Sequence, residues 1–239
     1  MRLPHRPGWL RRGLARARAS SPQHSETVPD SDQAREMTNE PTDPSSGVWL
    51  VVGLGNPGPS YAGNRHNVGY LVASELADRM GSPFRAHKSG RAEVVEGRLT
   101  PPGTPGPRVV LVRARTYMNE SGGPVKQLAT FYKVPPERIV AIHDELDLPF
   151  DSMRVKLGGG DNGHNGVRSL RGALGTGDFH RVRIGIGRPP GRQPVPDFVL
   201  SDYSPSERKA VPMQVISAAD AVESLVTEGL ERTQTRFNS

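Results

Sequence analysis

The residues best suited to acid–base chemistry in this chain are one histidine and one acidic cluster. His66 occurs in the segment Asn-Arg-His-Asn, and residues 143–147 read His-Asp-Glu-Leu-Asp at the end of an apolar run. A carboxylate that accepts a hydrogen bond from an imidazole holds the ring in the tautomer that can act as a base. This pairing predicts that His66 activates water, with one carboxylate of the cluster as its partner. The alternatives are that His66 is a helix cap or a surface residue.

The acidic cluster has two other interpretations, a solvated loop and a divalent-metal site. Neighbouring side chains of an extended chain point to opposite faces, so these groups cannot all converge on one ion. The chain has no cysteine, which excludes a disulfide scaffold, a zinc–thiolate site and a cysteine nucleophile. It also has no G-x-S-x-G segment that would indicate a serine nucleophile.

Asparagines near three predicted strand ends are the next candidates. Asn56 and Asn119 each follow an apolar run, and the glycine-rich segment 157–166 is expected to present His164 and Asn165 at a rim. Ligand crevices in open α/β sheets lie at the carboxyl ends of strands, so these carboxamides are candidate substrate contacts. A tight turn, a helix N-cap and a flexible linker are the respective structural alternatives.

Gly53, Gly55 and Gly58 match the G-x-G-x-x-G pattern of dinucleotide-binding proteins. The match is weak because a turn-rich loop at 59–65 follows, where the pyrophosphate would need a helix N-terminus. Glu75, at the distance expected for a ribose-binding carboxylate, falls in a helical pattern instead. A nicotinamide-dependent dehydrogenase therefore remains only a rival hypothesis.

Basic residues alternate along two predicted strands, so the members of each pair share a face: Arg154 with Lys156, and Arg181 with Arg183. The alternative is an ordinary solvated strand face. Paired cations next to a site favour a phosphate-binding patch instead. The net charge of the chain is +6, of which residues 1–47 contribute +1, so the part expected to fold is also basic.

The elements that must position these residues alternate between strands and helices. Apolar runs and period-two patterns predict strands at residues 48–52, 92–96, 109–112, 139–143, 153–157 and 182–186. Helical spacing predicts helices at 66–80, 123–133 and 166–174, and a last helix that opens with a capping box at Ser204 and Glu207 and is kinked or split at Pro212. The pattern is typical of an α/β fold with a single domain at 48–239, in which strands 92–96 and 109–112 form an antiparallel hairpin.

Residues 1–47 are predicted to be a disordered N-terminal extension. They begin with an arginine-rich stretch without acids and continue with serine, proline and acids, without apolar periodicity. Three explanations stay open: a transit-like segment, a basic nucleic-acid arm, or leader sequence ahead of a true start at Met37. No apolar core follows the arginines, which argues against a secretory signal, and no apolar run approaches the length of a membrane-spanning helix.

Together these segments resemble the bacterial-type peptidyl-tRNA hydrolase family over about residues 49–230. The resemblance rests on the order and spacing of Leu54-Gly-Asn-Pro-Gly58, Arg65-His-Asn67, Thr116-Tyr-Met-Asn119, His143-Asp-Glu-Leu-Asp-Leu-Pro149, Lys156-Leu-Gly-Gly-Gly160, Gly163-His-Asn-Gly166 and Phe179-His-Arg-Val-Arg-Ile-Gly-Ile-Gly187. It implies a mixed twisted β-sheet flanked by helices, in a cytoplasmic monomer without metal or organic cofactor. The implied activity is hydrolysis of the ester between a peptide and the 3′-terminal ribose of tRNA, which recycles tRNA from stalled or dropped-off translation.

The resemblance also implies a role for each residue that matches its motifs. His66 would activate water, Asp144 would orient His66, and Asn119 would lie near the developing oxyanion. Further residues would bind the peptide, the ester region or the 3′ end: Asn56, Tyr61, Tyr117, Met118, Asn119, His164 and Asn165. A third set would contact tRNA phosphates: Arg154, Lys156 and Arg183.

The chain departs from the family pattern at two places. Arg113-Ala114 stands where a Lys-Pro pair is common, and Asp161-Asn162 replaces a frequent His-Gly. Neither departure touches the expected base, but Asp161 adds an acid to a basic rim and would affect tRNA binding. The main rival hypothesis is a catalytically silent RNA-binding relative. Retention of His66 with Asp144 argues against it, because binding alone needs no oriented base.

Overall fold

A seven-stranded mixed sheet forms the centre of the computed structural model, which describes residues 47–238. Its strand order is β2-β3-β4-β1-β5-β7-β6. The strands are β1 (Val48–Gly53), β2 (Arg85–Ala86), β3 (Ala92–Gly97), β4 (Arg108–Ala114), β5 (Ile139–Glu145), β6 (Met153–Leu157) and β7 (His180–Gly185). The predictions for residues 1–46, including Met37 as a start, lie outside the described residues.

The central strands β4, β1, β5 and β7 run parallel to one another. The outer strands are antiparallel to their neighbours: β2 to β3, β3 to β4, and β6 to β7. The predicted hairpin is therefore confirmed as β3 and β4, and so is the mixed α/β fold. Parallel order brings the carboxyl ends of β1, β4 and β5 to one edge of the sheet, where a ligand crevice is expected.

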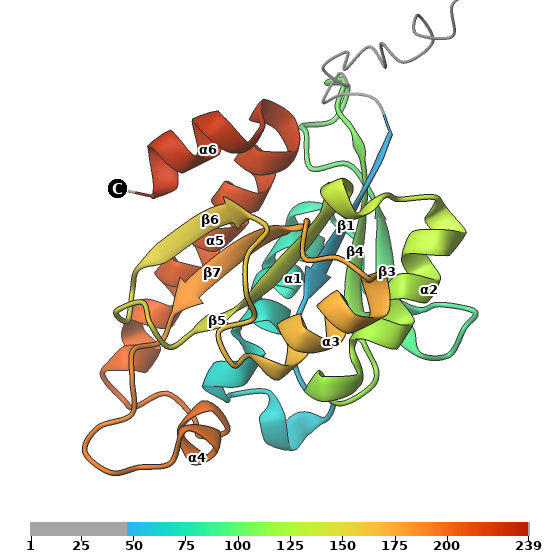
Figure 1. Ribbon diagram of the computed structural model, residues 1–239. Helices are drawn as coiled ribbons and strands as arrows, with labels where there is room; N and C mark the ends of the chain where they lie inside the picture. The colour runs from blue at the N-terminus through green and yellow to red at the C-terminus, as the bar shows by residue number, and fades with distance from the viewer. Residues whose placement is uncertain (1–46, 239) are drawn as a thin grey trace, which may run out of the picture. The chain divides into compact units, whose positions relative to one another are not determined.

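Helices cover both faces of the sheet: α1 (Val68–Arg79), α2 (Gly122–Tyr132), α3 (Asn165–Leu174), α4 (Val195–Val199), α5 (Glu207–Glu228) and α6 (Leu230–Phe237). Figure 1 shows α2 and α3 in front of the sheet, with α1 and α5 behind it. Val51 belongs to the core behind the sheet, whereas Leu50 and Val52 belong to the core in front. Strand β1 is thus buried on both faces, as its continuous apolar run predicts. Within residues 47–238, none of the helices is both long and apolar enough to cross a membrane.

Helix α1 lies unusually close to the central strands, which brings its first turn to the edge of the sheet. A Cβ atom added at Gly69 would lie 2.3 Å from the carbonyl oxygen of Ile142 and 2.6 Å from the backbone nitrogen of Leu54. Only glycine permits this approach of helix to strand. His66 lies just ahead of α1, in the 3-10 turn Arg65–Asn67, and not in the α-helix that was predicted to start there.

The last helices agree with the prediction at their start and differ from it further on. The capping box exists, since the Glu207 backbone nitrogen donates to Ser204 Oγ (3.3 Å) and the Ser204 nitrogen to Glu207 Oε2 (2.7 Å). The predicted split at Pro212 is wrong, because α5 runs through Pro212 without interruption. Proline removes one helical hydrogen bond there, and the buried face that α5 presents from Gln214 onward stabilises the helix after it. The chain breaks instead at Gly229, which has φ of 90°.

Candidate active site

A cavity of about 360 Å³ contains every side chain predicted to be catalytic or to bind substrate. These side chains come from the loops after β1 and β4, from the end of β5 and from the start of α3: Asn56, Tyr61, His66, Tyr117, Met118, Asn119, Asp144, His164 and Asn165. The cavity therefore lies at the carboxyl edge of the parallel strands.

Asp144 contacts two histidines in the floor of this cavity. His66 Nδ1 and His164 Nε2 each lie 2.9 Å from the same oxygen, Asp144 Oδ1. All three side chains are buried, and the two imidazole centroids are 4.8 Å apart. The prediction that one carboxylate of the acidic cluster faces His66 is thus met by Asp144.

Hydrogen-bond partners indicate which nitrogen of each ring carries a proton. His164 Nδ1 accepts hydrogen bonds from the backbone nitrogens of Gly166 (3.1 Å) and Val167 (3.3 Å), so its Nε2 is the donor to Asp144. His164 is therefore the N-cap of α3 and is buried, contrary to the expectation that it projects from the rim. On His66, donation from Nδ1 to Asp144 leaves Nε2 as the unprotonated nitrogen of the neutral ring.

The local charges shift the ionisation of these groups in opposite directions. Burial by itself lowers the pKa of His66, but the charge of Asp144 and its hydrogen bond outweigh burial and raise that pKa above its ordinary value of 6.5. Burial would raise the pKa of Asp144, and the two histidines overcome it, so this pKa lies far below the usual range for aspartate. Asp144 is consequently a fixed negative charge near neutral pH.

His143 supports the site from behind. Its Nδ1 donates to the backbone oxygen of Asp144 at 2.7 Å, and its ring lies edge-on to His164 at 4.8 Å between centroids. Burial first, and then the neighbouring His164, hold the pKa of His143 well below its ordinary value. His143 is thus a neutral ring that packs against the pair instead of a second base.

Asn56 is fixed by hydrogen bonds on several sides. Its Oδ1 accepts from the Met118 backbone nitrogen at 2.8 Å. Its backbone nitrogen donates to Asn67 Oδ1 at 2.9 Å, and Asn67 Nδ2 donates to its backbone oxygen at 2.9 Å. The Asn56 side-chain NH₂ group forms no hydrogen bond within residues 47–238, which leaves it available to a ligand in the cavity. Sequence reasoning assigned no role to Asn67, although a polar residue directly after His66 was the available signal.

The mouth of the cavity carries polar and aromatic side chains. Tyr61 and Tyr117 meet edge to face with ring centroids 6.3 Å apart. Met118 is buried below them, while Asn119 is exposed and its carboxamide bonds to no residue in the described part of the chain. Asn165 is also exposed, and its Oδ1 accepts from Arg168 Nη1 at 3.1 Å.

One wall of the cavity was missed by sequence analysis. It consists of Val195, Pro196, Val199 and Leu200, on and just after α4. Val195 and Leu200 are 39% and 43% exposed, which is high for aliphatic side chains. The available signal was the short apolar and proline-containing segment itself, which is too short for a helical pattern to stand out.

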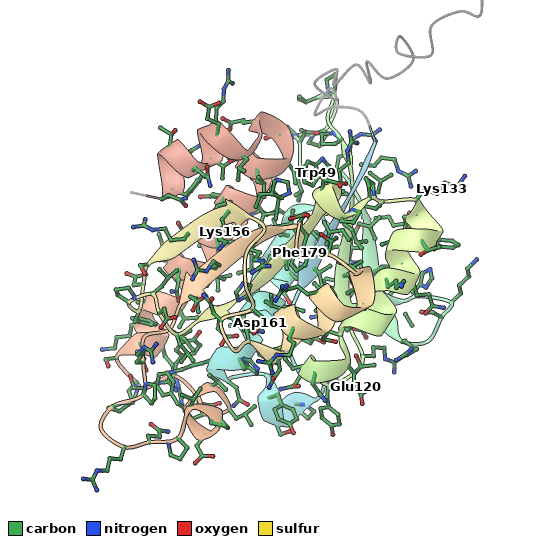
Figure 2. All side chains as sticks on the ribbon, in the orientation of Figure 1. Trp49, Glu120, Lys133, Lys156, Asp161 and Phe179 are labelled. Carbon is green, nitrogen blue, oxygen red and sulfur yellow. The ribbon has the colours of Figure 1, made fainter. Side chains whose placement is uncertain are left out.

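The predicted phosphate-binding residues lie outside the cavity, on one face of β6 and β7. Register pairs Arg154 with Arg183 and Lys156 with Arg181, so the two basic pairs lie side by side. Figure 2 shows Lys156 on β6 and Asp161 in the loop that leads to α3. Lys156 forms no ion pair within residues 47–238.

The two arginines of β7 are already engaged. Arg183 contacts the buried carboxylate of Glu145 through Nε (2.9 Å) and Nη2 (2.8 Å). Arg181 donates to the backbone oxygens of Gly159, at 2.7 Å, and Gly160. Arg154, on the same face of β6, donates to the backbone oxygen of Asn238. Lys156 is therefore the cation best placed for an external phosphate.

Asp161 affects the basic rim less than its charge suggests. Its carboxylate lies 3.3 Å from Arg168 Nη2 and 3.2 Å from Arg171 Nη1, and it accepts from the Gly163 backbone nitrogen at 3.0 Å. The Gly163 hydrogen bond and the two arginines lower the pKa of Asp161. Arginines of α3 thus compensate the acid that replaces the family's frequent histidine.

His66, Asp144 and His164 also form the group in residues 47–238 whose ligand atoms come within 4.8 Å of one another. An ion placed among them would have to replace both 2.9 Å hydrogen bonds to Asp144 Oδ1. The Nδ1 atom of His164 is already an acceptor for two backbone N–H groups. The arrangement therefore has the geometry of an oriented base.

Comparisons with known proteins identify one family for this chain. A sequence model of the family described as peptidyl-tRNA hydrolase matches residues 50–239. The chain is 60% identical over 191 residues to a peptidyl-tRNA hydrolase of Streptomyces coelicolor, covering 80% of this chain and 95% of that protein. It is 56% identical over 203 residues to one of Frankia alni, covering 85% and 99%. The crystal structure of peptidyl-tRNA hydrolase from Acinetobacter baumannii matches with a TM-score of 0.73 and 35% identity, covering 80% of this chain and 95% of that one.

Proposed function

The chain belongs to the peptidyl-tRNA hydrolase family, and on this premise we propose that it hydrolyses the ester between a peptide and the 3′-terminal ribose of tRNA. We place it in the cytoplasm as a monomer that returns tRNA from stalled or dropped-off translation. The observation that carries the proposal is His66 Nδ1 at 2.9 Å from the buried Asp144, which leaves Nε2 unprotonated in a cavity rich in carboxamides.

The reaction begins with a proton transfer from water to His66 Nε2. The resulting hydroxide attacks the ester carbonyl carbon, and the carboxamide of Asn119 donates to the oxygen that becomes negative. The bond from this carbon to the ribose oxygen then breaks. That oxygen takes the proton from His66, so the base returns to its neutral form. The peptide leaves as a carboxylic acid, which loses its proton to solvent and becomes a carboxylate.

Substrate binding divides into a peptide part and a tRNA part. Asn56, with Oδ1 occupied by the Met118 backbone, offers its NH₂ group to the peptide or the ester. The tyrosines at the mouth and the α4 wall surround the peptide. His164 and Asn165 lie at the side where the 3′ end of tRNA would enter, and Lys156 binds a tRNA phosphate. Arg154 and Arg183 help through the positive charge of the same strand face.

Release of peptide from purified peptidyl-tRNA tests the proposal. Multiple turnovers that depend on His66 support it, whereas tight tRNA binding without release would favour the catalytically silent RNA-binding relative. Spectroscopic titration with NADH addresses the dehydrogenase hypothesis. The structure argues against that hypothesis. The 3-10 turn Pro59–Tyr61 follows Gly58, where a bound pyrophosphate would need the N-terminus of an α-helix.

Replacing Lys156 with alanine should raise KM for peptidyl-tRNA with little change in kcat. Loss of one phosphate contact should also reduce the slope of log affinity against log salt by about 0.7–0.9. Lys209→Ala is the matched control, because this exposed lysine lies on α5, behind the sheet. Equal salt slopes for the parent and Lys156→Ala would exclude a direct phosphate contact.

Arg183→Ala should behave differently from Lys156→Ala. The Glu145 side chain is 3% exposed, and without Arg183 its charge would lose a partner with two contacts at 2.8 and 2.9 Å. Uncompensated buried charge is strongly destabilising. We expect a lower melting temperature for Arg183→Ala and an unchanged one for Lys156→Ala, by thermal unfolding. A parental melting temperature for Arg183→Ala would argue against this structural role.

A further inference from the structure

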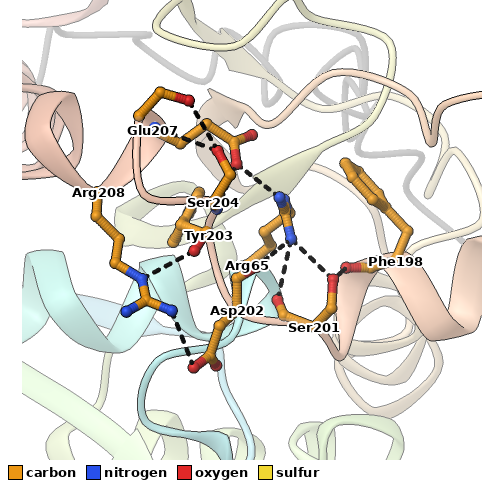
Figure 3. A network of polar contacts seen from close by, with 9 residues as sticks. Arg65, Phe198, Ser201, Asp202, Tyr203, Ser204, Glu207 and Arg208 are labelled. Carbon is orange, nitrogen blue, oxygen red and sulfur yellow. Dashed lines mark hydrogen bonds and ion pairs between the residues drawn. The ribbon is translucent and has the colours of Figure 1, made fainter.

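Arg65, the residue before His66, is a buried arginine whose two terminal nitrogens both bond to a distant segment, while its Nε has no hydrogen-bond partner within residues 47–238. Its side chain contacts none of the residues that would meet the ester. Nη1 donates to the backbone oxygen of Ser201 (3.2 Å), to Ser201 Oγ (2.8 Å) and to the backbone oxygen of Asp202 (2.7 Å). Nη2 pairs with Glu207 Oε2 at 2.7 Å. Figure 3 shows the guanidinium between these two sets of partners.

Two aromatic rings complete the surroundings of Arg65. Its guanidinium carbon lies 4.4 Å from the centroid of Phe198 and 5.3 Å from that of Tyr203. A planar guanidinium suits this position, because it stacks on aromatic faces while its edge donates in several directions. A lysine could provide neither the stacking nor the fork of donors.

The segment that Arg65 holds includes the α4 wall of the cavity. Ser201 directly follows Leu200, which lines the cavity together with Val195. The chain that reaches α4 from β7 is exposed at residues 190–197 and so provides little anchorage. The wall is therefore held mainly from its carboxyl side, by the small core of Phe198 and Tyr203 and by the hydrogen bonds of Arg65.

Arg65 and His66 are neighbours in sequence but have separate partners. The His66 ring is oriented by Asp144 of β5, and the Arg65 side chain by residues 198–207. The backbone nitrogen of Arg65 also donates to the Ser201 oxygen at 3.1 Å, and Asn64 Nδ2 donates to Asp202 Oδ1 at 2.9 Å. One short turn thus presents the base on one side and secures the wall on the other.

We propose that Arg65 is a positioning residue that holds the α4 wall against the cavity and thereby sets the preference for an apolar side chain in the peptide next to the ester. This inference rests on the proposed hydrolysis of peptidyl-tRNA. The apolar, half-exposed Val195 and Leu200 identify the chemistry of that side chain, because contact with an aliphatic group removes both from water. If the wall moves away, the peptide side chain loses this contact. The hydrogen bond between His66 and Asp144 is unchanged.

The experiment compares two N-acetylated aminoacyl-tRNAs, one with leucine and one with glycine, as substrates of the parent and of Arg65→Met. In the parent, we expect a lower KM for the leucine substrate. In Arg65→Met, that KM should rise about tenfold, which corresponds to about 1.4 kcal/mol, and approach the KM for glycine. The kcat for glycine and the pH at which activity falls should stay parental. Hydrogen exchange at residues 198–203 should become faster.

Two further variants protect the test against misfolding of Arg65→Met. Ser201→Ala removes only one acceptor of Nη1 and should shift the leucine-to-glycine KM ratio in the same direction by a smaller factor. Arg208→Met removes an exposed arginine that donates to the Tyr203 backbone oxygen from the solvent side, and should leave the ratio unchanged.

The outcomes separate this inference from the proposed function. A parent without hydrolytic activity would overturn the proposed function itself. An active parent whose leucine-to-glycine KM ratio is the same in Arg65→Met and in Ser201→Ala would overturn the role of Arg65 alone. Equal loss of kcat for both substrates, without a change in this ratio, would mean that Arg65 only stabilises the fold.

Discussion

Replacing His66 with alanine should lower the turnover of peptidyl-tRNA by about 10²–10⁴-fold, with little change in tRNA binding. An ester has a better leaving group than an amide, so the slow part of its hydrolysis is giving water the character of hydroxide. The unprotonated Nε2 of His66 does this in the mechanism above, and no phosphate contact depends on it. Single-turnover release of peptide and a separate tRNA binding measurement check the two halves of the prediction.

His87→Ala is the matched control for His66→Ala. His87 lies just after β2, where its ring packs against Phe131 with centroids 5.1 Å apart, and it does not line the cavity. Its loss should leave turnover at the parental level. If His66→Ala kept more than about a tenth of the turnover, His66 would not be a general base of ordinary efficiency. A carboxylate base or metal-assisted hydrolysis at residues 143–147 would then be favoured.

Replacing Asp144 with asparagine should lower turnover by about tenfold or more, but not beyond the loss in His66→Ala. The asparagine has nearly the same shape but no charge, so His66 is less firmly held in the tautomer with Nε2 unprotonated. The double variant should be no worse than His66→Ala, since an absent base cannot be oriented. Fully additive losses would mean that Asp144 acts independently of His66.

The pH dependence of kcat/KM gives this second prediction a distinct signature. His66 is active when neutral, and its pKa is raised above 6.5, so parental activity should fall as the pH drops through a value above 6.5. Asp144→Asn removes the charge that raises this pKa and leaves burial, which lowers it. The acid limb should therefore move to lower pH in the variant. A limb that stays in place would assign it to another group.

The sequence alone determined the local features of this protein. Continuous apolar runs predicted the central strands, because a strand that is covered on both faces is apolar on both and shows no alternation with polar residues. Period two predicted that Arg154 and Lys156 share a face, and the capping box of Ser204 and Glu207 formed as its spacing predicts. Each of these signals depends on residues a few positions apart, and local geometry fixes how such residues lie relative to one another.

Only the tertiary structure decided which side chains meet. Asp144 and Glu145 are adjacent acids on β5, yet Asp144 faces His66, 78 residues away in sequence, and Glu145 faces Arg183, 38 residues away. Periodicity shows that two neighbours point apart, but not which of them points to the cavity. Arg65 likewise finds its partners 136 to 142 residues away. Such contacts depend on how helices and loops pack across the sheet, and no local pattern in the sequence records that packing.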